Sequence, residues 1–192
     1  MNHIKKVRCD WLLNDQIYIN YHDNEWGVAQ YDSLKLFEKI CLEGQQAGLS
    51  WITILKKRDE YRRCFFNFDP CKIIQLRPED IEHLLENKGL IRNRLKLNSI
   101  VNNAHAYLNM MENGENFSQF IWSFVDNKPI INHFKDKSEV PINTDMSDRM
   151  SKELKKRGFS FVGSTICYAF MQSMGLVDDH VENCFKKMKL GE

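Results

Sequence analysis

The stretch SDRMSKELKKRGFSFVGST, residues 147–165, predicts two helices joined by a short hairpin. The first helix ends in a basic turn, which suits the negative end of its dipole, and Gly158 stops it. The connection ends at Gly163, where another backbone can approach closely, and the second helix begins at Ser164 and Thr165. Its unpaired N–H groups could bind a phosphate, as in a helix–hairpin–helix unit. An ordinary helical corner with solvated lysines is the alternative.

The remainder of the chain also predicts helices. Apolar residues recur at helical spacing, and the sequence contains no convincing run that alternates with period two. Asp32 can cap a helix that passes through Cys41, and Asp69 followed by Pro70 marks another helix start. The further helices are expected at residues 78–86, 93–111, 117–125, 147–157 and 164–174. Residues 126–146 show no clear periodicity and are expected to cross between parts of an all-α fold.

The composition of the chain excludes several classes of protein. It has 192 residues, 43% of them hydrophobic, which suits one unit over residues 1–192 with its own buried core. The 27 basic and 26 acidic residues leave a net charge of +1, so any DNA-facing surface must come from local clustering. No apolar run approaches a membrane span, and no signal peptide is evident. We therefore expect a cytoplasmic protein without a membrane partner.

Two pairs of cysteine and histidine lie near the two ends of the chain. Six cysteines in a cytoplasmic protein are small core residues, metal ligands or nucleophiles, because disulfides are rare in that compartment. His180 and Cys184 are four residues apart, so on a helix they would share one face. With Cys9 and His22 they would form a closed tetrahedral Cys2His2 set, which is typical of structural zinc. Spacing alone also fits four unrelated residues.

The first quarter of the chain is enriched in aromatic residues, which are Trp11, Tyr18, Tyr21, Trp26 and Trp51. Carboxylates and amides are interspersed among them, and flat rings beside such groups can stack on a base and read its edge. Glu43 falls in the apolar stretch CLEGQQAGL, residues 41–49, where a buried carboxylate would require a partner. A solvated helical glutamate fits the sequence equally well.

Four blocks together resemble a known family. They are YHDNEWGV at residues 21–28, CLEGQQAGLSW at 41–51, KRGF at 156–159 and DH at 179–180. These blocks are similar to those of the bacterial DNA-3-methyladenine glycosylase I family, which belongs to the helix–hairpin–helix glycosylase superfamily. The resemblance runs with few gaps over about residues 7–184, nearly the whole chain.

The resemblance implies a fold, an activity and a set of site residues. The fold would be a two-lobed helix–hairpin–helix structure whose ends are joined by one zinc ion on Cys9, His22, His180 and Cys184. The activity would be hydrolysis of the bond between 3-methyladenine and deoxyribose in double-stranded alkylated DNA, by base flipping, without strand cleavage and by a monomer. Glu43 would bind the base and act in catalysis, beside the substrate-binding residues Tyr21, Trp51, Trp11 and Tyr18. DNA contacts would come from Gly158, Gly163, Ser164 and Thr165.

One acidic residue and one competing class are left open by the sequence. Asp178 falls near the place where most of the superfamily has a catalytic aspartate, which the 3-methyladenine enzymes are thought to lack. Either Glu43 or Asp178 could then activate water, or neither. The rival class is a non-catalytic zinc-stabilised DNA-binding or interaction module, which would leave the aromatic and carboxylate cluster unexplained.

Overall fold

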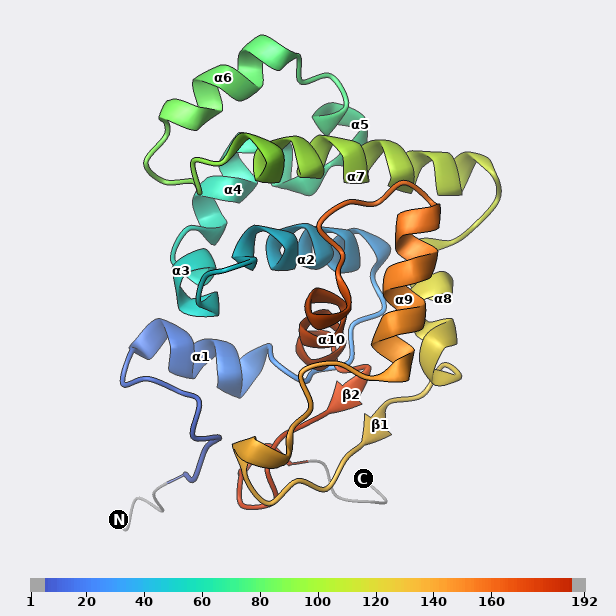
Figure 1. Ribbon diagram of the computed structural model, residues 1–192. Coiled ribbons are helices and arrows are strands. Elements are labelled where there is room, and N and C mark those ends of the chain that lie inside the picture. Colours follow the sequence, from blue (N-terminus) through green and yellow to red (C-terminus); the bar gives the residue numbers. More distant parts are fainter. Residues whose placement is uncertain (1–5, 188–192) are drawn as a thin grey trace.

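The structure is a computed structural model that describes residues 6–187. Helices α4 to α7 lie at one end of the molecule, and α1, α8, α9 and α10 lie with the two strands at the other (Figure 1). Helix α2 runs between these two groups (Figure 1). The α-helices are α1 Gln16–Asn24, α2 Ser33–Gln46, α3 Trp51–Leu55, α4 Arg58–Cys64, α5 Pro70–Ile73, α6 Pro78–Glu86, α7 Arg94–Glu112, α8 Phe117–Trp122, α9 Asp145–Lys156 and α10 Ser164–Ser173. The strands are β1 Ile130–Ile131 and β2 Val177–Asp178, and 3₁₀ turns occur at Phe66–Phe68, Ser123–Val125 and Lys137–Glu139.

Most of the predicted helix starts are confirmed to within one residue. The Asp32 carboxylate accepts a hydrogen bond from the Lys35 N–H at 2.9 Å, and the Asp69 carboxylate caps α5 ahead of Pro70. Helix α6 has the predicted bounds, and Asn93 is the N-cap of α7. Helix α9 begins two residues before the predicted start, because Thr144 and Ser147 form a reciprocal capping pair.

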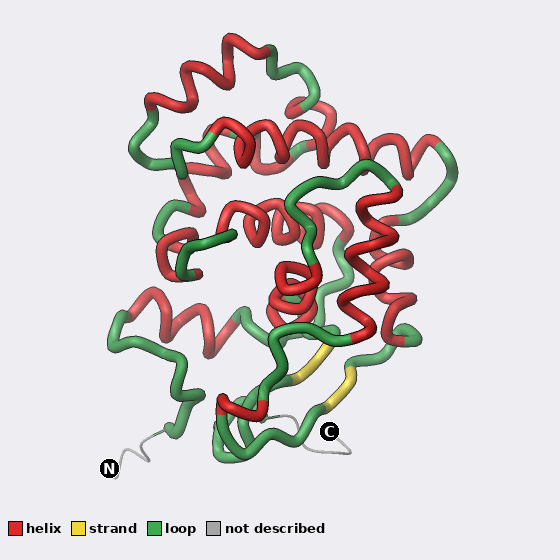
Figure 2. The backbone as a smooth tube through the Cα atoms, in the orientation of Figure 1, coloured by secondary structure: helices red, strands yellow, loops and turns green. Residues whose placement is uncertain are grey.

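The expectation of helices alone is corrected by one short pair of strands. Ile130 lies beside Val177 in a parallel pair, within the segment that was expected to cross between parts of the fold. Figure 2 shows this pair as the two short strands that join otherwise distant loops. A strand of two residues is too short to alternate visibly in the sequence, so only the pairing reveals it.

Helix α2 is the central element of the core. Leu36, Phe37 and Ile40 are fully buried, and α2 packs against both α7 and α10. Its polar residue Gln45 is buried as well, and its amide donates to the Lys96 carbonyl on α7 at 2.8 Å. The Tyr61 hydroxyl on α4 donates to the other end of the same amide at 3.2 Å. These bonds satisfy a buried amide and hold three helices together.

The first and last described segments of the chain lie side by side, near the turn that follows α10. Gly175 follows α10 with a φ of +70°, and a Cβ there would lie 2.4 Å from the backbone nitrogen of Ala29. This position therefore needs glycine both for its left-handed backbone and for its close packing. The Phe185 N–H also donates to the Val7 carbonyl at 2.9 Å, which places the segment that carries Cys184 beside the one that carries Cys9. In the described part of the chain, no helix is long and apolar enough to span a membrane.

Candidate active site and metal centre

A cavity of about 330 Å³ lies between α1, the end of α2, α3 and α10. Its aromatic lining residues are Trp11, Tyr18, Tyr21, Trp26, Trp51 and Tyr168. Its polar lining includes Glu43, Gln46, Thr165, Gln172 and Asp179. The structure thus brings all five predicted base-binding residues into one cavity, although they come from α1, α2, α3 and the segment before α1. A concave site with many rings and a few polar groups is typical of small-ligand binding.

The rings in this cavity lie close enough to form a stacking surface. The ring centroids of Tyr21 and Trp51 are 5.5 Å apart, and those of Trp11 and Tyr18 are 5.1 Å apart. Tyr21 and Trp51 are buried, whereas Trp11 and Tyr18 are partly exposed. Burial raises the pKa of Tyr18 to about 12 and that of Tyr21 well above its usual range, so both phenols keep their protons at neutral pH.

Glu43 is buried in the wall of this cavity, so the sequence-based alternative of a solvated glutamate is wrong. The residue is 2% exposed, and its Oε1 lies 2.8 Å from the Lys39 ammonium. Its Oε2 is buried and has no hydrogen-bond partner within the described structure. The indole Nε1 of Trp51 is likewise buried without a partner in residues 6–187. The cavity wall therefore holds one acceptor and one donor that a ligand could satisfy.

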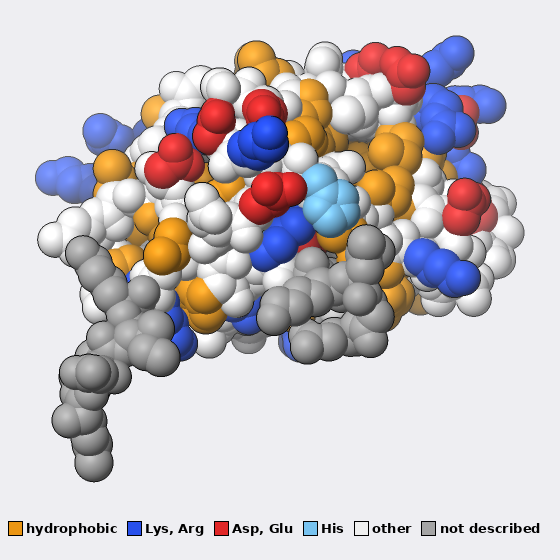
Figure 3. All heavy atoms as spheres, turned by 90° about the horizontal axis from the view of Figure 1, so that it is seen from below, with side chains coloured by type: hydrophobic (Ala, Val, Ile, Leu, Met, Phe, Trp, Pro, Cys, Tyr) orange, Lys and Arg blue, Asp and Glu red, His pale blue; other side chains and the backbone are white. Residues whose placement is uncertain are grey.

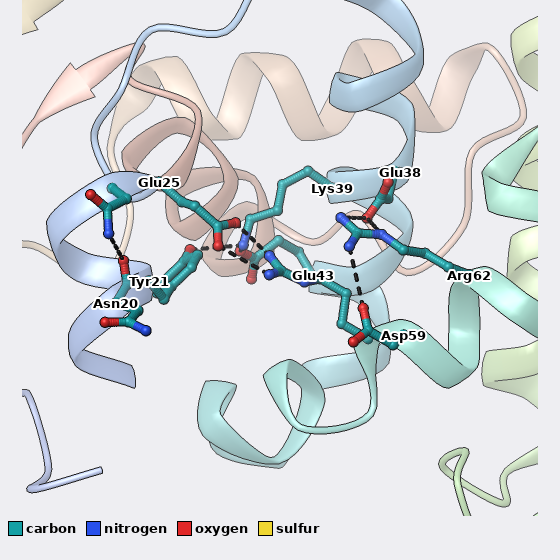
Figure 4. Close-up of polar contacts among 10 residues, drawn as sticks. Asn20, Tyr21, Glu25, Glu38, Lys39, Glu43, Asp59 and Arg62 are labelled. Atoms are coloured by element: carbon teal, nitrogen blue, oxygen red, sulfur yellow. Dashed lines mark hydrogen bonds and ion pairs between the residues drawn. The ribbon is translucent and has the colours of Figure 1, made fainter. Parts of the chain in front are cut away.

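Lys39 is a site residue that the sequence analysis missed. It is 6% exposed, and its ammonium also donates to the Tyr21 hydroxyl oxygen at 2.9 Å. The same nitrogen lies 3.2 Å from the centre of a ring of Trp51, within the range of a cation–π contact. Figure 4 shows Lys39 extending from α2 toward Tyr21 and Glu43. The spacing of Lys39 and Glu43, four residues apart on a predicted helix, could have suggested this pair.

Two adjacent aspartates that follow α10 lie in different surroundings. Asp178 is fully buried, and its Oδ1 lies 2.7 Å from the His180 ring Nδ1. It is not among the residues that line the cavity, which argues against a role for it in activating water there. Asp179 does line the cavity, but its carboxylate accepts from the Tyr168 hydroxyl at 2.7 Å and from the Gln172 amide at 2.8 Å. The Asn132 amide donates to its other oxygen at 2.7 Å, so Asp179 joins α10 to the segment after β1.

Three of the four predicted metal ligands form a compact group. One ligand atom from each of Cys9, His22 and Cys184 lies within 4.8 Å of the others, and all three residues are buried. His180 lies next to them, with its ring centre 5.2 Å from that of His22. His180 and Cys184 do not share a helix, which corrects the sequence-based expectation, because the chain after β2 forms turns. Folding of irregular segments, and not helical spacing, brings these two residues together.

The surroundings of these four residues fit a metal ion. The Nδ1 of His22 lies 2.9 Å from the Asp23 carboxylate, and the Nδ1 of His180 faces Asp178 in the same way. This arrangement orients the Nε2 of each ring for a metal. The Nε2 of His180 is buried without a partner in the described residues, as expected for a ligand atom. Hydrogen bonds with Cys9 and His22 lower the pKa of the Cys184 thiol, which favours the thiolate that binds metals, while the same bond to Cys184 raises the pKa of Cys9.

The predicted hairpin between α9 and α10 has an open face. Gly158 ends α9 with a φ of +95°, and Gly163 is the N-cap of α10 without a side-chain cap. A Cβ at Gly163 would meet no atom within 4 Å, so the backbone there is accessible. The Ser164 hydroxyl bonds to Ser147 at 2.8 Å, and Thr165 lines the cavity. The Ser164 hydroxyl is therefore already hydrogen-bonded, and Thr165 belongs to the cavity wall. The backbone N–H groups remain the candidates for phosphate contact.

The chain is similar to known proteins over most of its length. A family model described as methyladenine glycosylase matches residues 11–187. The chain belongs to the methyladenine glycosylase family. The DNA-3-methyladenine glycosylase of Haemophilus influenzae is 62% identical over 178 residues, which are 93% of this chain and 96% of that protein.

Two solved structures of similar proteins support this family membership. A crystal structure of a 3-methyladenine DNA glycosylase I superposes with a TM-score of 0.94 at 57% identity, covering 95% of this chain and all of that one. A variant of a 3-methyladenine DNA glycosylase I in complex with 3-methyladenine superposes with a TM-score of 0.91 at 38% identity, covering 95% of this chain and 98% of that one. The mostly helical fold of this methyladenine glycosylase is thereby confirmed.

Replacement of Asp179 by asparagine tests whether this cavity residue is structural. Asparagine keeps one acceptor oxygen but turns an NH2 group toward donors that the carboxylate now satisfies. We expect Asp179→Asn to lower the free energy of unfolding by about 2 to 3 kcal/mol, measured by chemical denaturation. Asp10→Asn is the matched control, because Asp10 also lines the cavity but is exposed. A stable Asp179→Asn protein with impaired base release would instead place this carboxylate at the reacting atoms.

Proposed function

We propose that this chain is a DNA repair enzyme that hydrolyses the N-glycosidic bond of 3-methyladenine in alkylated DNA. The observation that carries the proposal is the Oε2 of Glu43, which has no partner in residues 6–187 and is buried among aromatic rings in a cavity of about 330 Å³. Each relative described above is named for this activity. A non-catalytic zinc-stabilised DNA-binding or interaction module, the rival class, would leave both the cavity and this oxygen without a use.

Recognition takes place after the damaged nucleotide has been flipped out of the duplex. Flipping is least costly for a damaged base, because it stacks and pairs less well than a normal one. Trp11 and Tyr18 stack on the flipped base from the partly exposed side of the cavity, and Tyr21 and Trp51 contact it from the buried side. Glu43 Oε2 accepts from the exocyclic amine of adenine.

The reaction depends on charge more than on proton transfer to the leaving base. N3 methylation gives the nucleotide's adenine a positive charge, so the base leaves as a neutral molecule when it takes the electrons of the bond to C1′. Water then adds to C1′ and loses a proton. Glu43 acts in catalysis through its negative charge, which favours the cationic base and the positive charge that develops on the sugar. Lys39 forms an ion pair with Glu43, so its nitrogen is not available to form a Schiff base with the sugar. We therefore expect no strand cleavage.

The α9–α10 hairpin holds the DNA while the base is in the cavity. Backbone N–H groups at Gly163, Ser164 and Thr165 contact phosphates of double-stranded DNA without reading sequence, and Gly158 contacts the DNA from the turn after α9, where its own N–H is bonded to the Lys155 carbonyl. Lys155 and Lys156 are exposed beside them and add positive charge. Charges of both signs are interspersed on the face seen in Figure 3, in keeping with the near-neutral chain. We propose a cytoplasmic monomer with two lobes, in which this hairpin and the cavity form one binding surface.

One structural zinc ion on Cys9, His22, His180 and Cys184 joins the two ends. The proposal is supported by the two buried thiols, the partnerless His180 Nε2 and the carboxylate behind each histidine. Two thiolates and two imidazoles leave no position for water, so the ion supplies a cross-link and no reaction chemistry.

Glu43→Gln is the informative change for base recognition. Glutamine keeps the shape and one acceptor but loses the charge, so affinity for free 3-methyladenine should fall about ten- to hundredfold. Base titration and single-turnover release should be measured on the same preparation, and release should slow as well. Glu38→Gln is the control, because Glu38 lies on the same helix but pairs with Arg62 outside the cavity. Parental values for both quantities would leave recognition to Tyr21 and the tryptophans.

Elemental analysis tests the zinc proposal, with one zinc per chain expected in protein that has not been exposed to chelators. Cys184→Ala should lose the ion and lower the melting temperature by roughly 10 °C or more, because a structural metal contributes directly to folding. Cys71→Ala removes an exposed cysteine outside the cluster and should change neither quantity. If the parental protein contained no metal and Cys184→Ala had the same melting temperature as the parent, zinc would be removed from this proposal.

Gly163→Asp tests the hairpin, since an aspartate fits the open space but repels a phosphate. Affinity for abasic DNA should fall about tenfold at low salt, and the difference should shrink as salt rises. Gln75→Glu adds the same charge on an exposed position beyond α5 and serves as the control. Equal DNA affinity of Gly163→Asp and the parent at all salt concentrations would leave the hairpin with a structural role only.

A further inference from the structure

Lys39 has the surroundings of a functional residue, although it does not line the cavity. Its ammonium is buried where α1, α2 and α3 meet, and it contacts Tyr21, Glu43 and Trp51, one residue from each helix. All three of these partners line the base cavity. A buried lysine costs free energy through desolvation, so its position here calls for a compensating role.

The first consequence of Lys39 is the direction of the hydrogen bonds. An ammonium has three donors and no acceptor, so it occupies Glu43 Oε1 and the Tyr21 oxygen as acceptors. What remains for a ligand is the Glu43 Oε2 as an acceptor, with the Tyr21 O–H and the Trp51 Nε1–H as donors. The major-groove edge of adenine has the complementary pattern, a donor amine beside an acceptor ring nitrogen.

The second consequence is the charge of Glu43. A buried carboxylate without a counter-charge takes up a proton, and it then presents a donor in place of an acceptor. The other charged groups near Lys39 are Glu25 and Arg58, which pair with each other at 3.0 Å. Tyr18 and Tyr21 are neutral phenols, so Lys39 is the counter-charge in direct contact with Glu43. Burial lowers the pKa of Lys39 to about 8 against the opposing effect of Glu43, which leaves the ammonium protonated at neutral pH.

We propose that Lys39 is a positioning residue for base recognition, which holds Glu43 as a carboxylate and Tyr21 as a hydrogen-bond donor so that the cavity presents the complement of adenine. Lys39 acts through these two residues and does not touch the base. The inference rests on the proposed function, because it assumes that the cavity binds 3-methyladenine.

Lys39→Met tests this role, because methionine has a similar length and no charge. The affinity for free 3-methyladenine should fall about tenfold or more, because Glu43 loses its counter-charge and the Tyr21 oxygen loses the donor that directs its own O–H. Lys35→Met, on the exposed side of the same helix, should keep the parental affinity. Parental affinity in a folded Lys39→Met protein would overturn the proposal.

A double-mutant cycle with Glu43→Gln provides a second measurement. Because Lys39 acts through the Glu43 carboxylate as well as through Tyr21, adding Lys39→Met to Glu43→Gln should change base affinity clearly less than Lys39→Met does in the parent. The double variant also removes both buried charges, so it should fold even if Lys39→Met alone does not. Additive losses would overturn the role of Lys39. Such a result would leave the proposed function intact provided the parent releases 3-methyladenine, whereas a parent without base release would refute the function itself.

Discussion

The burial of helix α2 on several sides is the constraint on which the rest of the structure depends. Its apolar residues pack against α7 and α10, and its polar residues Lys39, Glu43 and Gln45 are buried with them. Buried polar groups must be satisfied, so each one fixes the position of a neighbouring element. Gln45 holds α7 and α4, and Lys39 holds α1 and α3. On α2, the Glu43 Oε2 has no partner among residues 6–187, and Glu43 lines the cavity, so this oxygen is the candidate atom for ligand binding.

Helix α10 couples the two halves of the proposed site. Its first residues form the open face of the hairpin, and farther along Tyr168 and Gln172 line the base cavity. A phosphate held at the start of this helix and a base held along its side would therefore be fixed relative to one another by a single rigid element. The Asp179 carboxylate anchors the same helix to the segment after β1 through Tyr168, Gln172 and Asn132.

The junction of the chain ends supports the cavity from the other side. Trp26 stacks near His22 and packs edge-on against His180, so the predicted metal ligands and the cavity wall share one aromatic cluster. Asp178 lies under His180, and the adjacent Asp179 faces the cavity. Asp178 is the last residue of β2, and Asp179 follows it directly. One dipeptide thus contacts both a predicted metal ligand and the cavity.

The sequence by itself determined the helix starts at Asp32, Asp69 and Pro78, the stop at Gly158 and the family to which the chain belongs. Caps and turns depend on residues a few positions apart, so they can be predicted without the rest of the fold. The tertiary structure alone decided that His180 and Cys184 meet in turns and not on a helix, and that Glu43 is buried. It also decided that Lys39 reaches Tyr21, 18 positions away, and Trp51 on a third helix. Such contacts depend on how whole helices pack, and the packing is determined by the combined burial of the core and not by any local pattern.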